Sequence, residues 1–290
     1  MTLGLDRTAV DVFDGVVARL TEAGIPTSVG DAEIILAHAL GVRRSDVQSG
    51  ALNDAILTVD QRDRVLDFTN RRVDREPLQH LTGRAFFRQL ELSVGPGVFV
   101  PRRETEFVTQ LAIDALLASE LEHPIAVDLG TGAGAIALSM AVEVPAATVY
   151  GVEISPEAFT WTSRNFAEHA PHNGHPVLGD MTDALSHLDG QVDVVAGNPP
   201  FLAEGIEPVT PEVRLFDPGV SWAAGGDGLL IIRALSKTAR RLLKPGGHLA
   251  FEHGISQGRR VGELLESDGW LSITNHQDPR GEYRVTTARR

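Results

Sequence analysis

Hydrophobic residues in the first quarter of the chain recur at the three- or four-residue spacing of a helix. The positions that share this spacing are Val12, Val16, Leu20, Ile34, Ile35 and Ala39. Glycines and a proline near residues 24–26 and 41 interrupt the pattern, as helix breakers do between helices. We expect Ser28 or Asp31 to cap the second helix and Asp60 to cap a later one. The pattern predicts a small helical domain over residues 1–82.

After the helical region the pattern changes to the alternation of a half-buried strand. Leu90, Leu92 and Val94 fall on one face of such a strand. The sequence Gly-Pro-Gly at residues 95–97 can turn the chain into the short apolar run that follows it. We therefore expect a β-hairpin linker over residues 83–104.

Segments with helical and strand patterns alternate from residue 105 to the end of the chain. A helix is expected over residues 105–121, and the strand candidates are residues 125–129, 148–153, 192–196, 248–253, 271–276 and 283–287. This alternation predicts an α/β domain over residues 105–290 with a doubly wound, mostly parallel sheet. In such sheets ligands bind beyond the carboxyl ends of the strands, near the point where the strand order reverses.

Composition excludes several classes of function. The 290 residues include no cysteine, which excludes disulfides, thiolate metal sites and cysteine nucleophiles. A net charge of -13 repels nucleic-acid phosphates, so nucleic acid is a disfavoured partner. No apolar run is long enough for a membrane span or a secretion signal, and we expect a cytoplasmic protein. His169, His172 and His175 lie in an expected helix end and loop, and we predict no metal site.

A glycine-rich loop joins an apolar strand to an apolar helix in the segment IAVDLGTGAGAIALSMA. The residues that we expect to meet a cofactor here are Asp128, Gly130, Thr131, Gly132, Ala133 and Gly134. Glycine lets the backbone turn sharply and lets a ligand approach the main chain. The alternating glycines differ from the GxGxxG fingerprint of dinucleotide sites, which favours S-adenosylmethionine over NAD. A plain strand-to-helix turn is the structural alternative.

Three further residues extend the expected cofactor site. Glu153 ends the next strand, where a carboxylate can accept hydrogen bonds from both ribose hydroxyls. Asp180 follows a short apolar piece and can accept from the adenine amino group, while the thioether of Met181 packs on the ring. A strand-end Asp followed by a core Met is an equally simple interpretation of the last pair.

Candidate catalytic residues follow the buried-looking strand at residues 192–196, in the segment GNPPF. A planar amide or aniline-like nitrogen is a poor nucleophile because its lone pair is delocalised. The Asn198 side-chain oxygen and the Pro199 carbonyl can each accept one N–H and direct that lone pair at a methyl group on sulfur. Pro199 and Pro200 make a rigid exit from the strand, and Phe201 can stack on the flat substrate group. We assign Asn198 to the cofactor site as well.

Other interpretations of GNPPF remain. Guanine-N2 methyltransferases of ribosomal RNA and adenine-N6 methyltransferases of DNA use similar segments for the same nitrogen chemistry. A rigid loop without catalysis, in a cofactor-binding partner protein, is a further alternative. The acidic charge disfavours the nucleic-acid enzymes, and the intact Asn198 and loop glycines disfavour the non-catalytic protein.

Taken together, these motifs resemble one family across nearly the whole chain: the release factor glutamine methyltransferases of the HemK/PrmC type. The segments that carry the resemblance are PLQHLTG, GVFVPRRETE, DLGTGAGAIAL, GNPPF, GGDGL and LKPGGHLAFEHGISQG. Departures from the family pattern are Phe201 where Tyr is usual, Arg103 where Pro is usual, and an atypical stretch over residues 211–226.

The resemblance implies a class I methyltransferase with a seven-stranded sheet that uses S-adenosylmethionine and releases S-adenosylhomocysteine. The implied substrate is the side-chain amide of the glutamine in the Gly-Gly-Gln motif of peptide-chain release factors, held by Asn198 and Pro199. The helical domain is expected to dock the release factor, and the PRRETE segment to help close the cofactor site. We expect a monomer.

Overall fold

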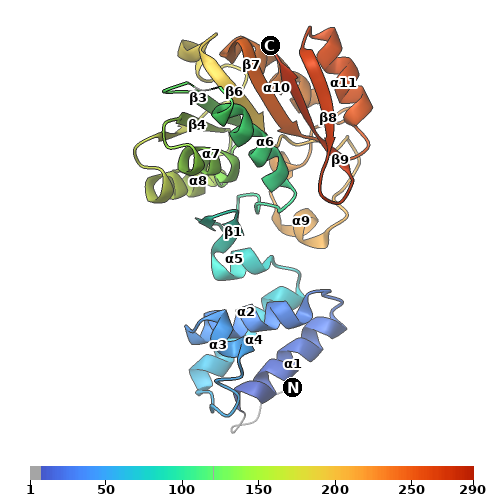
Figure 1. Ribbon diagram of the computed structural model, residues 1–290. Coiled ribbons are helices and arrows are strands. Elements are labelled where there is room, and N and C mark those ends of the chain that lie inside the picture. The colour runs from blue at the N-terminus through green and yellow to red at the C-terminus, as the bar shows by residue number, and fades with distance from the viewer. Residues whose placement is uncertain (1–7, 120) are drawn as a thin grey trace. The chain divides into compact units, whose positions relative to one another are not determined.

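The computed structural model of the protein describes residues 8–119 and 121–290, which fall into two compact units. The helical unit comprises residues 8–83 and 211–216, and the sheet unit comprises residues 84–210 and 217–290. Their helices and strands are labelled in Figure 1. In the described part of the chain, no helix combines the length and the apolar character needed to cross a membrane.

In the described residues, the helical unit has six helices: α1 (Ala9–Glu22), α2 (Ser28–Leu40), α3 (Arg44–Gln48), α4 (Val59–Val73), α5 (Leu78–Thr82) and α9 (Pro211–Phe216). Val12, Val16 and Leu20 of α1 are buried and share a core with Ile35 and Leu36 of α2. The spacing of apolar residues therefore predicted this core correctly.

The expected helix caps are wrong. α2 begins at Ser28 itself, and no side chain caps it. Asp31 lies in the first turn of α2, where its carboxylate accepts a hydrogen bond from Nε of the buried Arg72 at 2.8 Å. Thr58 caps α4 in a reciprocal capping box, so Asp60 falls inside the first turn of that helix. Each carboxylate is thus a residue of the helix and not its cap.

The short helix α9 belongs to the helical unit although it lies far along the chain. Glu212 accepts a hydrogen bond from Nη1 of Arg72 at 2.9 Å, across 140 residues of sequence. Arg72 also pairs with Asp31, and its side chain is only 7% exposed. Removing one partner from a buried ion pair leaves an uncompensated charge, which is strongly unfavourable. The segment between β6 and α10 is therefore anchored midway in the helical unit.

The main sheet of the sheet unit has seven strands in the order β5-β4-β3-β6-β7-β9-β8. The strands are β3 (Ile125–Leu129), β4 (Thr148–Glu153), β5 (Gly174–Leu178), β6 (Val192–Gly197), β7 (Leu243–Glu252), β8 (Leu271–Gln277) and β9 (Tyr283–Arg289). β9 runs antiparallel to both of its neighbours, and the other pairs are parallel. The predicted α/β fold with a mostly parallel seven-stranded sheet is confirmed.

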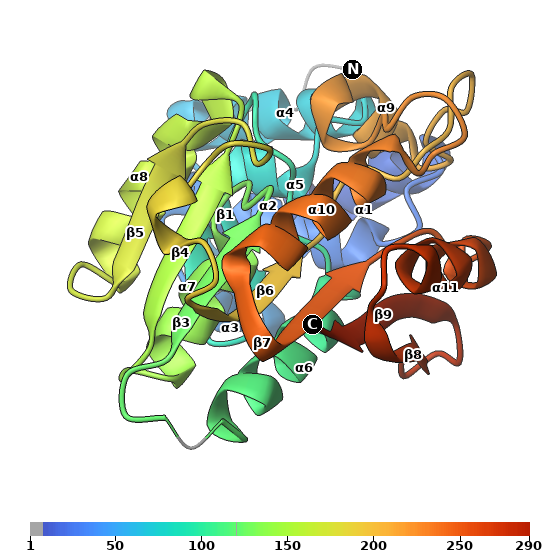
Figure 2. The ribbon, with the colours of Figure 1, turned by 90° about the horizontal axis from the view of Figure 1, so that it is seen from above.

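Helices cover both faces of this sheet, and α10 crosses β6 and β7 as Figure 2 shows. The helices are α6 (Thr105–Leu117), α7 (Ala135–Glu143), α8 (Pro156–His169), α10 (Leu230–Leu242) and α11 (Gly258–Ser267), with single 3₁₀ turns at Ser186–Leu188 and Gly219–Ser221. Along β3, Ala126 packs in the core with α6 and α7, whereas Val127 packs in the core with α10 and α11. Because both faces are buried, the central strands are continuous apolar runs that sequence patterns can locate.

The hairpin forms with its turn in a different place from the predicted one. β1 (Arg84–Phe87) and β2 (Leu90–Ser93) pair antiparallel and are joined at Arg88, while residues 98–100 form no strand. The Gly-Pro-Gly segment instead packs on α8. A Cβ on Gly95 would lie 2.4 Å from the ring of Trp161, whose indole N–H donates to the Pro96 carbonyl at 3.1 Å.

Two other boundaries differ from the prediction. α6 ends at Leu117, four residues before the expected end at residue 121. The sequence did not mark β5 as a full strand, because Gly174 and Pro176 interrupt its apolar pattern. The strand is partly exposed, lies at the edge of the sheet and pairs with β4 along its length. An edge strand tolerates a proline because one side needs no ladder partner.

Candidate active site

Two of the predicted motifs meet where the order of the strands reverses. The chain passes from β3 outward to β4 and β5, and then returns to β6 on the other side of β3. β3 and β6 are parallel neighbours, with Asp128 opposite Ala196. The glycine-rich loop after β3 and the GNPPF segment after β6 therefore leave the same edge of the sheet side by side. Open α/β sheets bind ligands at this position.

The glycine-rich loop needs backbone conformations that other residues rarely adopt. Gly130, Gly132 and Gly134 have φ values of 82°, 55° and 91°. A Cβ on Gly130 or Gly132 would meet no atom within 4 Å, whereas a Cβ on Gly134 would lie 2.9 Å from the Leu138 side chain. Gly130 and Gly132 thus leave open space beside the backbone, and Gly134 permits close packing at the start of α7.

Asp128 lies beneath this loop and not on the pocket wall. Its carboxylate is fully buried, and Oδ2 accepts hydrogen bonds from the Thr131 hydroxyl at 2.6 Å and from the Ala137 N–H at 3.2 Å. Burial raises the pKa of Asp128 to about 7, against the lowering effect of these bonds. These two hydrogen bonds hold the loop against the first turn of α7.

Glu153 lies at the end of β4 and lines the pocket. Its carboxylate is 7% exposed, and its two oxygens accept from the backbone N–H groups of Gly132 at 2.9 Å and Ser155 at 2.8 Å. Each oxygen has a further lone pair that can accept from a ligand hydroxyl. Glu153 therefore joins the glycine-rich loop to α8 and presents a fixed acceptor.

Asp180 and Met181 line the same pocket from the loop after β5. Asp180 is exposed, and its Oδ1 accepts from both the N–H and the hydroxyl of Thr182 at 2.8 Å. Met181 is half-buried against the core that contains α10. An exposed acceptor next to a polarizable thioether is the arrangement that was predicted for an adenine ring.

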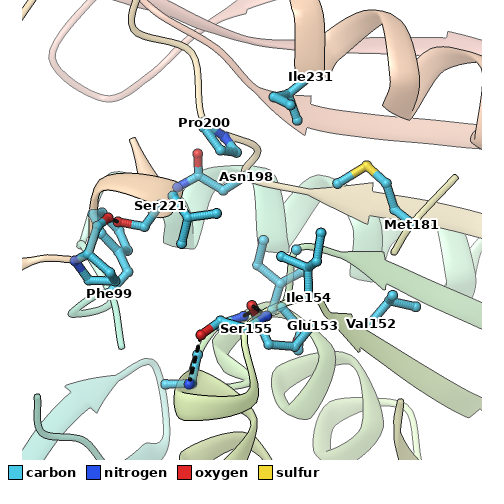
Figure 3. Close-up of a pocket in the computed structure, with 18 of the residues that line it drawn as sticks. Phe99, Val152, Glu153, Ile154, Ser155, Met181, Asn198, Pro200, Ser221 and Ile231 are labelled. Atoms are coloured by element: carbon cyan, nitrogen blue, oxygen red, sulfur yellow. Dashed lines mark hydrogen bonds between the residues drawn. The ribbon is translucent and has the colours of Figure 1, made fainter. Parts of the chain in front are cut away.

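The pocket itself has a volume of about 270 Å³. Figure 3 shows Asn198 and Pro200 on one side and Glu153 with Ser155 on the opposite side. The predicted site residues that line it are Gly130, Thr131, Gly132, Ala133, Glu153, Asp180, Met181, Asn198 and Pro200. Asp128, Gly134, Pro199 and Phe201 are absent from its wall. Most of the predicted residues thus meet in one cavity.

The two absent residues of the GNPPF segment pack elsewhere. Pro199 is buried. Phe201 is half-buried against the core that contains α10 and α11, and its carbonyl accepts from Nε2 of Gln257 at 2.9 Å. The stacking of Phe201 on a substrate stays a prediction. Gln257 also donates to Gly228, so it ties the exit of β6 to the start of α10.

Asn198 takes part in a chain of side chains that the sequence did not predict. Its Nδ2 donates to Oγ1 of Thr105 at 3.1 Å, and the Thr105 hydroxyl donates to Oε2 of Glu252 at 2.8 Å. Thr105 and Glu252 are buried. Burial raises the pKa of Glu252 to about 7. An acidic residue inside the apolar end of β7 was the available signal for this chain, and its partners could not be identified from spacing.

Another part of the pocket is lined by residues of the stretch 211–226, whose role the sequence did not indicate. Pro218, Val220, Ser221 and Ala223, from the atypical stretch, line the cavity together with Phe99 and Pro101 from the region of the PRRETE segment. Arg102 donates to the buried Asp217 at 2.8 Å and stacks over the Phe99 ring at 5.2 Å. Burial raises the pKa of Asp217 to about 6 although Arg102 lowers it. This ion pair joins the two segments at the pocket.

The lining residues fit an adenosyl group. Flat apolar surface comes from Val152, Ile154 and Ile231, and acceptors for hydroxyl or amino hydrogens come from Glu153 and Asp180. The open space at Gly132 admits a ligand to the backbone. Among the described residues, no three His, Asp or Glu side chains converge in a way that suits a metal ion.

Comparison with known proteins gives matches over almost the whole chain. Residues 11–83 match a family model described as the PrmC N-terminal domain, and residues 89–217 match the methyltransferase small domain. The chain is 45% identical over 277 residues to the release factor glutamine methyltransferase of Streptomyces coelicolor, covering 94% of each protein. It is 42% identical over 288 residues to the Bifidobacterium longum protein of the same name, covering 96% of this chain and 98% of the relative.

A third relative carries a different name. The 4-amino-L-phenylalanine/4-methylamino-L-phenylalanine methyltransferase of Streptomyces pristinaespiralis is 37% identical over 268 residues, covering 90% of this chain and 88% of the relative. The three relatives share methyl transfer in their names and differ in the substrate that the names specify.

Proposed function

This chain belongs to the family of release factor glutamine methyltransferases, and we propose that it methylates the glutamine side-chain amide in the Gly-Gly-Gln motif of peptide-chain release factors. The protein is a methyltransferase that uses S-adenosylmethionine. The proposal concerns the acceptor substrate. It agrees with the expectation from the sequence that the acceptor is a planar nitrogen.

S-adenosylmethionine would supply an electrophilic methyl group. The methyl group would pass from sulfur to the nitrogen lone pair, with S-adenosylhomocysteine as the leaving group, and the nitrogen would give its proton to water. The residues of the protein orient both reactants. Glu153 and the glycine-rich loop hold the adenosyl part, and Asn198 accepts an N–H of the substrate amide. Positioning of this kind converts a weak nucleophile into a competent one without a strong base.

The observation that carries the proposal is the presence of Asn198 in the same cavity as the glycine-rich loop and Glu153. An amide oxygen at this place can accept from an amide N–H2, which rotates the nitrogen lone pair toward the methyl group. The near-complete coverage of two relatives named for glutamine methylation supports the choice of substrate.

A free aromatic amine is the second candidate acceptor. The relative from Streptomyces pristinaespiralis is named for 4-amino-L-phenylalanine, whose aniline-like nitrogen poses the same lone-pair problem as an amide. Phe201 lacks the hydroxyl of the tyrosine that is usual in the family, so the segment itself does not distinguish the two acceptors. The higher identity to the glutamine methyltransferases favours the protein substrate.

The test is incubation with methyl-labelled S-adenosylmethionine and, in separate reactions, a release factor, 4-amino-L-phenylalanine and ribosomal RNA. We expect a gain of about 14 Da on the Gly-Gly-Gln peptide, the mass of one added methylene group. Label in the free amino acid alone would transfer the function to the second candidate. Label in RNA alone would assign the site to a nucleic-acid substrate.

The proposal also covers the docking of the release factor, the location of the protein and its oligomeric state. We propose that the helical unit docks the release factor, and its match to a separate N-terminal family model supports this. The proposal places the protein in the cytoplasm, where release factors act on ribosomes. A monomer is the proposed state in solution, to be checked by light scattering.

A further inference from the structure

The side chain of Asn198 has two ends of nearly equal shape and opposite chemistry. Oδ1 can accept an N–H of the substrate, whereas Nδ2 can only donate. A 180° turn of the amide group exchanges them with little change in packing. If Nδ2 faced the substrate, its hydrogens would meet the hydrogens of the substrate amide. The reaction therefore needs a device that holds one orientation.

Thr105 and Glu252 form such a device. A hydroxyl carries one hydrogen, and the hydrogen of Thr105 is directed to Oε2 of Glu252 at 2.8 Å. Only lone pairs of Thr105 Oγ1 then remain for Asn198, so this oxygen can accept and cannot donate. The Asn198 group that lies 3.1 Å from Thr105 can then only be Nδ2, and the structure places Nδ2 there. Oδ1 is then the end of the Asn198 amide that remains to accept from a substrate.

The groups around Glu252 act on the charge of its carboxyl group in opposite directions. Nη1 of Arg284, from β9, lies 3.9 Å from Oε1 of Glu252 and favours the carboxylate. Glu104 and Asp278 act in the opposite direction, and so does burial. His253, the next residue of β7, is itself buried and has a lowered pKa, so it adds no positive charge at neutral pH. The pKa of Glu252 is about 7 as a result, and the ionised form, which predominates above this pH, leaves Oε2 free to accept from Thr105.

We propose that Thr105 and Glu252 are positioning residues that hold the Asn198 amide with Oδ1 toward the reacting nitrogen. The inference rests on the proposed function, because it requires a substrate nitrogen that donates N–H to Asn198. Thr105 and Glu252 act through Asn198, and neither supplies nor removes a proton in the reaction.

The first test compares Thr105→Val with Thr105→Ser. Valine keeps the shape of threonine and removes the acceptor, so kcat for methylation of the release factor falls by about 10- to 100-fold, as for loss of a buried hydrogen bond. The dissociation constant of S-adenosylmethionine, measured by calorimetry, stays within about twofold because the adenosyl contacts remain. Thr105→Ser keeps the hydroxyl and restores most of the rate.

Thr109→Val is the matched control. Thr109 is buried one turn further along α6, and its hydroxyl donates to the Thr105 carbonyl and does not reach the cavity. The same loss of a hydroxyl at this position leaves kcat near that of the unchanged protein. A similar loss of kcat in both valine variants would assign the effect to the stability of α6 and overturn the proposal.

The second test is a double-mutant cycle. In an Asn198→Ala background there is no amide to orient, so Thr105→Val lowers kcat no further. Glu252→Met removes the acceptor of the Thr105 hydrogen and lowers kcat, and it adds nothing to Thr105→Val. Losses that multiply in either combination would contradict a role through Asn198, and full kcat in Glu252→Met would remove Glu252 from the proposal.

These outcomes are distinguishable from failure of the proposed function. Assays of the unchanged protein identify the acceptor. If it methylates the free amine and not the release factor, the variants are assayed on the amine. The N–H2 group of the amine requires the same orientation of Asn198. The positioning proposal fails when Thr105→Val, with an unchanged melting temperature, matches the kcat of the unchanged protein on whichever acceptor is methylated.

Discussion

The two sides of the pocket are built in different ways. The cofactor side is centred on one short loop, residues 130–133, with Glu153 from the adjacent strand bonded to the backbone of that loop. The substrate side depends on three side chains from three elements, separated by 93 and 147 residues along the chain. Backbone in a loop is insensitive to most substitutions, whereas a chain of side chains fails when any member is changed. We therefore expect changes on the first side to alter affinity and changes on the second to alter kcat.

Asn198→Ala is expected to have the largest effect. Loss of the acceptor lowers kcat by about 10²- to 10³-fold, the size seen when one positioned hydrogen-bonding group is removed from an active site. The affinity for S-adenosylmethionine stays nearly unchanged, because the loop and Glu153 are intact. Steady-state rates and calorimetry on the same preparation measure both quantities. Weakened cofactor binding with retained turnover would contradict the division between the two sides.

Glu153→Ala gives the complementary result. The carboxylate accepts from two backbone N–H groups and is placed to accept from the ribose, so its loss weakens S-adenosylmethionine binding by about 1–3 kcal/mol. At saturating cofactor, kcat is retained to a large extent. Titration calorimetry gives the dissociation constant, and an unchanged value would remove Glu153 from the cofactor site.

Glu252→Gln tests whether the buried carboxylate of Glu252 lowers the free energy of unfolding at high pH. The folded pKa of Glu252 is raised from 4.5 to about 7, so the folded protein holds a proton that the unfolded chain has lost between these pH values. The free energy of unfolding therefore decreases as the pH rises from about 4.5 to about 7. Glu252→Gln cannot titrate and avoids this decrease, and we expect it to be more stable at pH 8 by about 1–2 kcal/mol.

The measurement is urea unfolding of both proteins at pH 5 and pH 8. Asp128 and Asp217 also have raised pKa values and titrate in both proteins, so the difference between the two curves isolates Glu252. If the free energies of unfolding of the two proteins differed by the same amount at pH 5 and pH 8, the titration of Glu252 would not be linked to folding.

Gly132→Ala is expected to have the smallest effect on the fold. The residue has a φ of 55° and open space at its Cβ position, so alanine destabilises the protein by about 1 kcal/mol through backbone strain alone. The added methyl group enters the cofactor space and lowers affinity. Gly134→Ala is the comparison: its Cβ would meet Leu138 and Phe166, so its melting temperature falls further. A lower melting temperature for Gly132→Ala than for Gly134→Ala would mean that the loop packs differently.

Sequence patterns located the parts of the molecule that depend on near neighbours. β3, β4 and α7 were predicted because a strand buried on both faces and a helix in the same core are apolar along their length. The loop residues 130–134 were identified because only glycine adopts such φ values readily. β5 was not recognised as a full strand, because its conformation depends on pairing with β4 and its own residues indicate a strand weakly.

Local sequence patterns were enough to locate six of the seven strands, the glycine-rich loop and the position of Asn198 after β6, since each depends on residues that are adjacent in the chain. The hydrogen bonds that link Asn198 through Thr105 to Glu252 became visible only in the folded chain, as did the ion pair of Glu212 with Arg72. The same holds for the four pocket-lining residues between positions 218 and 223. Side chains brought together across more than 90 residues have no common spacing, and burial, which governs the pKa of Glu252, exists only after folding.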